Sequence, residues 1–223
     1  MKKLNYNGQA EQDKFVCNIL KNKTDGFFIE VGSRYPIRIN NTYVLESSLN
    51  WKGIMFEWQK KRFEESYKLH RPNSNYVFGD AQQHNYREIF NTYNVPKNID
   101  YLQLDIEPPR KTLNVLKALD GQVMGDYKFA IVTFEHDVGR CKNADLRNES
   151  REILRDRGYC LVFGDITNGH PRWVYEDWYV HPNLVDMDYV EKLQSDNEAN
   201  YGPGFRFIPK TLNWKDIEYF DYK

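Results

Sequence analysis

Acidic side chains follow five successive strand-like runs of this sequence, where carboxylates could bind a ligand or take up a proton. They are Glu30, then Glu57, then Asp80, then Asp105 with Glu107, and last the run Glu135, His136 and Asp137. In an open α/β sheet, ligands bind beyond the carboxyl ends of the strands. A single acid in such a place can equally cap the following helix, and Asp80 suits that interpretation. Acids at five successive strand ends favour a ligand site at one edge of a sheet.

The first of these runs, GFFIEVGSRYPI, limits the ligands that the following loop can hold. A dinucleotide site needs G-x-G-x-x-G, so that backbone amides and a helix N-terminus can bind pyrophosphate, but here Gly32 alone marks the turn. The phosphate-loop motif G-x-x-x-x-G-K-[ST] is also absent from the sequence. A cofactor with a ribose, an amino group and a positive centre but no phosphate would suit acids around one glycine. S-Adenosylmethionine has these features.

The elements that must position these acids alternate between strands and helices. A helix is predicted over 13–20, before a first strand at 26–31, and Asn41 or Thr42 is expected to cap the helix that follows this strand. The later predicted strands are 53–58, 75–80, 99–107, 127–137, 159–166 and 173–181, and the predicted helices are 42–49, 60–70, 86–93, 112–119 and 146–158. This alternation indicates a largely parallel sheet covered on both faces. The last two strands have no helix between them, which predicts an antiparallel hairpin at or near an edge.

The length of 223 residues suits one sizeable domain with a well-buried core. We predict a single domain over 1–223, with an N-terminal helical segment over 1–25, the sheet core over 26–182 and a C-terminal extension over 183–223. This extension is polar apart from GFRFIP and IEYFDYK, so it is predicted to be a partly ordered cover or an interaction arm.

Composition restricts the partners and the compartment. The formal net charge of −1 provides no global field to recruit nucleic acid or an anionic membrane, so neither is expected as a partner. Three widely spaced cysteines argue against a disulfide framework and suit a reducing compartment. The amino terminus lacks the apolar core of a signal peptide, and no segment approaches the roughly 18 apolar residues that span a bilayer. A cytoplasmic location is therefore expected.

Seven stretches, in their order, resemble the FkbM-type S-adenosylmethionine-dependent methyltransferases, several of which act on sugar hydroxyls. They are FFIEVGS, NNTYVLE, NWKGIMFEW, IDYLQLDIE, FAIVTFEHD, REILRDRGYCLVFGDI and EDWYVHP, and the likeness runs from about Gly8 to Pro182. The resemblance implies a Rossmann-like class I methyltransferase fold, with a mostly parallel seven-stranded sheet and an antiparallel C-terminal hairpin. After the first strand the family usually has an aspartate–glycine pair, whereas this sequence has GSRYPIR.

The resemblance also implies which residues hold the cofactor. They are Gln12, Glu30, Gly32, Ser33, Glu57, Trp58, Asp80 and Asp105, with Glu30, Gly32 and Ser33 under the methionine part. Glu57 is expected to accept hydrogen bonds from both ribose hydroxyls, because its two oxygens can meet two donors. Trp58 would flank the adenine or belong to the core. Asp80 would accept a hydrogen bond from the adenine amino group or cap a helix.

Transfer of a methyl group to a sugar hydroxyl depends mostly on positioning, and a base that removes the hydroxyl proton would help. The candidates for this base are Asp105, Glu107, His136, Asp137 and His181. The same cluster could hold a divalent cation such as magnesium, with Asp105 and Glu135 as ligands, or could line the site of the cationic cofactor. His136 could alternatively be a structural hydrogen-bonding group. Trp178 beside His181 could form a sugar platform or be part of a packed hairpin.

The sequence therefore predicts an S-adenosylmethionine-dependent O-methyltransferase that acts on a sugar, a glycan or another small-molecule hydroxyl. The altered loop after the first strand motivates an alternative, a catalytically inactive binding module with the methyltransferase fold. A nucleotide-dependent oxidoreductase on a similar sheet is a third possibility, and the missing glycine fingerprint counts against it.

Overall fold

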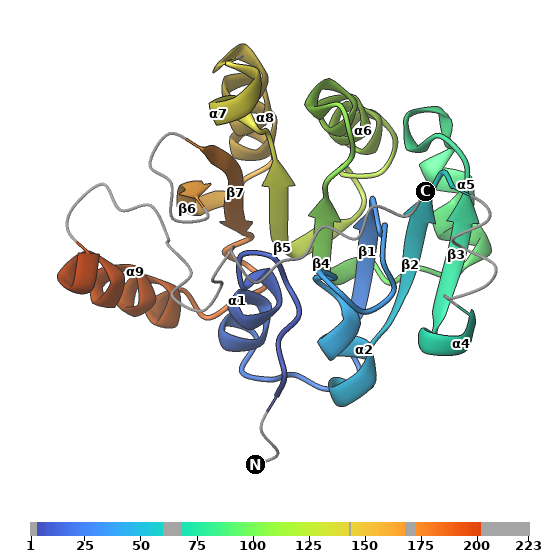
Figure 1. Cartoon of the computed structure of the whole chain (residues 1–223), viewed down its shortest axis with the longest axis horizontal. Helices are drawn as coiled ribbons and strands as arrows, with labels where there is room; N and C mark the ends of the chain where they lie inside the picture. Colours follow the sequence, from blue (N-terminus) through green and yellow to red (C-terminus); the bar gives the residue numbers. More distant parts are fainter. Residues whose placement is uncertain (1–3, 60–67, 143, 168–172, 202–223) are drawn as a thin grey trace.

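A seven-stranded sheet forms the centre of the protein in this computed structural model, which describes residues 4–59, 68–142, 144–167 and 173–201 (Figure 1). The strands are β1 (Phe27–Val31), β2 (Lys52–Glu57), β3 (Ser74–Phe78), β4 (Asn98–Leu104), β5 (Lys128–Glu135), β6 (Cys160–Thr167) and β7 (Val174–Val180). Their order across the sheet is β3-β2-β1-β4-β5-β7-β6. β1 to β5 are parallel, and β7 is antiparallel to both β5 and β6. The predicted mostly parallel sheet with an antiparallel hairpin at its edge is confirmed.

Helices pack on both faces of this sheet. The first face is covered by α1 (Gln12–Ile19), α2 (Tyr43–Leu49) and α9 (Met187–Tyr201). The second face is covered by α5 (Tyr86–Thr92), α6 (Pro109–Gln122) and α8 (Ala144–Asp156). Three short segments complete the described helices: α4 (Lys68–His70), the 3-10 helix η2 (Ala81–Gln83) and α7 (Val138–Cys141).

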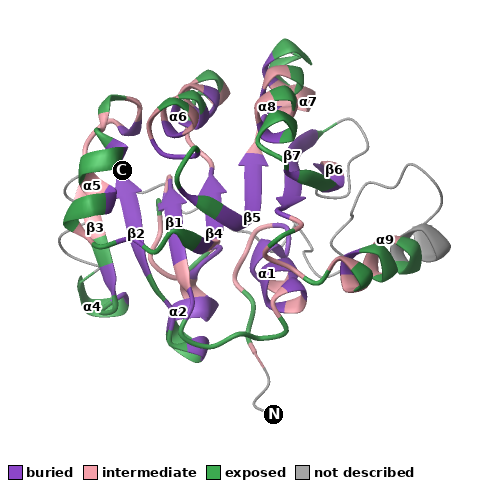
Figure 2. Ribbon diagram, turned by 180° about the vertical axis from the view of Figure 1, so that it is seen from behind, coloured by how far each residue is buried: buried purple, intermediate pink, exposed green. Residues whose placement is uncertain are grey.

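The helices pack because their apolar residues recur at helical spacing. In α6, Leu113, Leu116 and Leu119 are fully buried against the second face, and Pro109 occupies the first turn, where its missing N–H is not needed. The central strands are buried on both faces (Figure 2). In β1, Ile29 belongs to the core under the second face and Phe28 to the core under the first, as alternation along a strand requires.

The chain reverses its direction across the sheet between β1 and β4. From β1 the chain adds β2 and β3 on one side, and it then returns to place β4 and β5 on the other. The carboxyl ends of these two neighbouring strands mark the place where α/β sheets bind ligands. β7 points the opposite way (Figure 1), so its amino end lies at this edge.

Some predicted features lie outside the described residues. Of the helix predicted over 60–70, the structure describes Lys68–His70 alone, and both apolar stretches of the C-terminal tail fall in residues 202–223. Within the described ranges, the helices are all too short or too polar to cross a bilayer.

Candidate functional site

Gly32 lies where the ends of β1 and β4 approach most closely. Its backbone has a positive φ of 92°, and a Cβ atom added there would lie 1.7 Å from the carbonyl oxygen of Asp105. The amide of Gly32 donates to the carbonyl of Phe56, and the amide of Asp105 donates to Val31. The close approach at Gly32 is thus one that the protein's own backbone makes, and the fold itself requires glycine here.

Replacing Gly32 by alanine is expected to lower the free energy of unfolding by about 3 kcal/mol, because overpacking adds to left-handed strain. Gly158→Ala is the matched control, since Gly158 also has a positive φ of 85° but no atom within 4 Å of the added Cβ. Gly158→Ala should lower the free energy of unfolding by only about 1 kcal/mol. If a denaturant titration gives the same decrease for both variants, the contact with Asp105 is unimportant.

Glu57, at the end of β2, holds the loop that follows β1. One of its carboxylate oxygens accepts a hydrogen bond from the amide of Arg34 at 3.0 Å, and the other accepts one from the amide of Gln59 at 2.9 Å. Each carboxylate oxygen can accept a second bond. Glu57 is therefore held in place with acceptor capacity left on both oxygens, as a pair of hydroxyl donors would need.

Glu30 is a buried acid on β1, directed to the first face. Asn40 donates to its carboxylate at 3.1 Å, and the same amide donates to the carbonyl of Tyr35. Burial raises the pKa of Glu30 to about 7, against the opposing effects of Arg71 and of the hydrogen bond from Asn40. Glu30 lies near the end of β1 and Ser33 just after it, and their place under the methionine end of a cofactor stays a prediction.

Three acids stand side by side on adjacent strands at the carboxyl edge: Asp105, Glu135 and Glu176, here called the carboxyl row. Asp105 directly follows β4, Glu135 ends β5, and Glu135 pairs in register with Glu176 on β7. The carboxyl groups of Asp105 and Glu135 lie close enough for each to affect the pKa of the other, and burial raises the pKa of both. Gln12 of α1 donates to Glu176 at 2.8 Å, and burial raises the pKa of Glu176 to about 8.

Glu176 was missed by the sequence analysis, which considered only acids at the ends of strands. It lies near the start of its strand, and the antiparallel direction of β7 brings that start to the carboxyl edge. The predicted hairpin was the available signal, because it reverses which end of the strand faces the site.

A second group of charges surrounds the carboxyl row on its outer side. Arg140 of α7 forms ion pairs with both Glu107 and Asp137. Glu107 is exposed, whereas Asp137 is partly buried, and burial raises the pKa of Asp137 despite Arg140. The predicted proximity of Asp105, Glu107, Glu135 and Asp137 is therefore observed, with one arginine among them.

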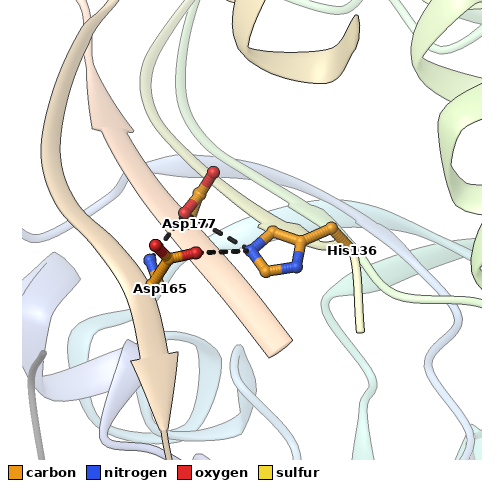
Figure 3. A group of neighbouring side chains, drawn as sticks. All are labelled: His136, Asp165 and Asp177. Carbon is orange, nitrogen blue, oxygen red and sulfur yellow. Dashed lines mark hydrogen bonds and ion pairs between the residues drawn. The ribbon is translucent and has the colours of Figure 1, made fainter. Parts of the chain in front are cut away.

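His136 points away from this row and into a cluster between β6, β7 and α8 (Figure 3). Its Nε2 lies 3.4 Å from Asp177 and 3.9 Å from Asp165, and its Nδ1 accepts a hydrogen bond from the amide of Val138. Although burial raises the pKa of Asp177, hydrogen bonds from Arg151 and the nearby His136 ring hold it below its ordinary value. This arrangement fits the structural alternative for His136 better than a role as a base.

The cluster of His136, Asp165 and Asp177 is also the one group among the described residues with three potential ligand atoms close enough to hold a metal ion. Arg151 makes two hydrogen bonds to Asp177, at 2.7 and 2.8 Å, and Arg147 donates to Asp165 at 2.7 Å. The two arginines already neutralise the two carboxylates, so a metal ion is not needed to balance their charge.

His181 lies at the opposite edge of the sheet from the carboxyl row. Its amide donates to the carbonyl of Ala130, near the amino end of β5, and its ring packs against Tyr159. The expectation that His181 faces the same cleft as Asp105 is therefore not met, because β7 runs antiparallel. Trp178 is fully buried and stacks on Phe15, so it belongs to the packed core and cannot be a sugar platform.

The two remaining predicted residues lie on the β2–β3 side. Asp80 caps η2 by accepting a hydrogen bond from the amide of Gln82 at 3.1 Å, as its structural interpretation predicted. Trp58 directly follows β2 and is 68% exposed, so it is not part of the core. Its ring remains accessible to a planar ligand.

Comparisons with known proteins identify the fold. The sequence matches no family model and no curated protein. Among solved structures, SMU.1697c from Streptococcus mutans, assigned as a methyltransferase and solved with SAH, has 15% identity, with 81% of this chain and 98% of that chain covered, at a TM-score of 0.51.

Two further solved structures agree with this result. An assigned rRNA methylase from Clostridium thermocellum has 14% identity, covers 79% of this chain and 98% of its own, and has a TM-score of 0.50. An assigned caffeoyl-CoA O-methyltransferase from Staphylococcus aureus has 12% identity, with 76% and 82% covered, at a TM-score of 0.50. The chain has the Rossmann-like fold of the class I methyltransferases.

Proposed function

We propose that this protein is an S-adenosylmethionine-dependent O-methyltransferase that acts on a hydroxyl of a sugar or glycan, as its resemblance to the FkbM-type enzymes implies. The observation that carries the proposal is the set of acids around Gly32 at the reversal point between β1 and β4. Glu30, Glu57 and Asp105 lie there, without the glycine-rich loop that a pyrophosphate needs. We also propose that the protein is cytoplasmic and that it binds neither nucleic acid nor a membrane.

The residues present suit this cofactor. Glu57 has acceptor capacity for two ribose hydroxyls, and Glu30 beside Ser33 can accept from an amino group. When bound, S-adenosylmethionine supplies a methyl group on a positively charged sulfur. Asp105, after β4, and Glu135, at the end of β5, would stabilise the positive charge of this sulfur.

Asp105 is the residue that we assign to the acceptor hydroxyl. It is half-buried next to Gly32, and the carboxyl group of Glu135 lies close to its own. An ionised Asp105 would orient the hydroxyl and accept its proton as the new bond forms. If magnesium takes part, Asp105 and Glu135 are the ligands that would hold it.

Replacing Glu57 by alanine is expected to weaken binding of S-adenosylmethionine by about 10- to 100-fold, because two donors lose a charged acceptor. The measurement is calorimetric titration with S-adenosylmethionine and with S-adenosylhomocysteine. Glu191→Gln serves as the control, because Glu191 is exposed on α9, which packs against β6.

Two results would count against the proposal. If the parent protein binds neither compound, the alternative of an inactive module with this fold is favoured. If the parent binds both and Glu57→Ala binds equally well, Glu57 has no part in the site.

A further inference from the structure

We propose that the acceptor is an amino sugar, whose protonated amino group binds to the carboxyl row of Asp105, Glu135 and Glu176. This inference rests on the proposed function, because it assigns the carboxyl row to the acceptor side of a methyltransferase site. It names the charge of the acceptor, which the proposed function leaves open.

The three carboxyl groups lie close together because of the sheet. Neighbouring strands are about 4.8 Å apart, and the three residues occupy successive strands in register on the first face. Gln12 of α1 packs over this face and holds Glu176. The row lies on the side of Gly32 away from Glu57, so a cofactor bound between Gly32 and Glu57 would leave Glu135 and Glu176 to a second ligand.

No lysine or arginine within the described ranges forms an ion pair with any member of the row. Arg34 and Arg140 lie close enough to lower the pKa of Asp105, but neither forms an ion pair with it, and Arg140 is engaged by Glu107 and Asp137. Glu176 is buried and Asp105 and Glu135 are partly buried, and carboxylates withdrawn from water without a paired cation are unfavourable. A cationic ligand would remove this penalty, and the single charge of a sulfonium would offset only one carboxylate.

Two uncharged groups near the row point to the same kind of ligand. The side-chain oxygen of Gln103, which is 2% exposed on the first face two residues before Asp105, has no hydrogen-bond partner. The hydroxyl of Tyr175, a residue 7% exposed, also has none, and burial together with Glu176 and Glu135 raises its pKa. Buried polar groups are normally satisfied. The Gln103 oxygen can only accept a hydrogen bond, the Tyr175 hydroxyl can accept one as well as donate one, and an ammonium group brings three donors.

The spacing suits an organic cation better than a preformed metal centre. Among the described residues, three potential ligand atoms come close enough for one metal ion at His136, Asp165 and Asp177, and not at the row. An ammonium group on a sugar ring can reach separate carboxylates through its own donors and through neighbouring hydroxyls. The ring hydroxyl that is methylated would then lie beside Asp105.

The test uses the full chain saturated with S-adenosylhomocysteine, which is neutral at sulfur and so leaves the row without a cation. Calorimetric titrations with glucosamine, glucose and N-acetylglucosamine compare sugars that differ in charge. We expect glucosamine to bind about 10- to 100-fold more tightly than the two neutral sugars. Glu176→Gln should reduce this preference about tenfold while keeping the hydrogen bond with Gln12, and Glu191→Gln should leave it unchanged.

The outcomes separate this inference from the proposed function. Binding of S-adenosylhomocysteine together with equal affinities for glucosamine and glucose overturns the amino-sugar inference and leaves the methyltransferase proposal standing. Preference for glucosamine that survives in Glu176→Gln also overturns it, because the row would not be the binding site. If the protein binds glucosamine through Glu176 but binds no S-adenosylhomocysteine, the cation site stands and the proposed function fails.

Discussion

Asp105→Asn is expected to lower the rate of methyl transfer by about two to four powers of ten, the span of general-base effects. The amide keeps the shape of the side chain but loses the charge that orients and deprotonates the acceptor hydroxyl. Cofactor affinity and the melting temperature should change little, because the backbone contact of Asp105 with Gly32 is retained. The rate is measured as S-adenosylhomocysteine formed with a sugar acceptor.

Two controls make this result specific. Asp126→Asn removes an exposed carboxylate, paired with Arg87 on the surface, and should leave the rate unchanged. A chelator added to the parent protein then distinguishes a metal-assisted reaction, which magnesium would restore, from a metal-free base. If Asp105→Asn works at the parent rate, Asp105 is neither base nor metal ligand, and the row serves only to bind positive charge.

Arg71→Met is expected to lower the free energy of unfolding by about 3–5 kcal/mol, as removal of one partner of a buried ion pair does. Arg71 is fully buried and donates to Glu46 at 2.7 Å, to Thr42 at 2.7 Å and to Asn40 at 2.9 Å. Without it, the buried carboxylate of Glu46 has no cation. The measurement is denaturant unfolding followed by circular dichroism.

Arg87→Met is the matched control, because Arg87 pairs with Asp126 while both side chains are about half exposed. It should leave the free energy of unfolding nearly unchanged, since exposed ion pairs contribute little. If Arg71→Met lowers the free energy of unfolding no more than Arg87→Met does, the buried network has no structural role.

The Arg71 network also connects stability to the candidate site. Asn40 accepts from Arg71 through its oxygen and donates to Glu30 through its amide nitrogen, so one side chain joins the two groups. The loop after β1 is therefore held from both of its ends, by Glu57 at Arg34 and by Arg71 at Asn40. This is how the protein orders GSRYPIR without the glycines of a phosphate-binding loop.

The sequence by itself determined the elements, because their signals are local. The alternation of Phe28, Ile29, Glu30 and Val31 predicts a strand buried on both faces, and the spacing of Leu113, Leu116 and Leu119 predicts a helix with one apolar face. The lack of a helix between β6 and β7 was enough to predict their antiparallel pairing. The position of Asp80 before η2 was enough to predict its cap.

Only the tertiary structure decided which of the chemically capable residues share a site. The direction of β7 moves Glu176 to the carboxyl edge and His181 to the other, and the contact between Gln12 and Glu176 joins residues 164 positions apart. His136 is next to Glu135 in sequence, yet alternation along the chain turns it toward Asp177. Strand direction, the neighbour of each strand and the side of the sheet that a residue faces depend on contacts between distant segments, and no local pattern contains them.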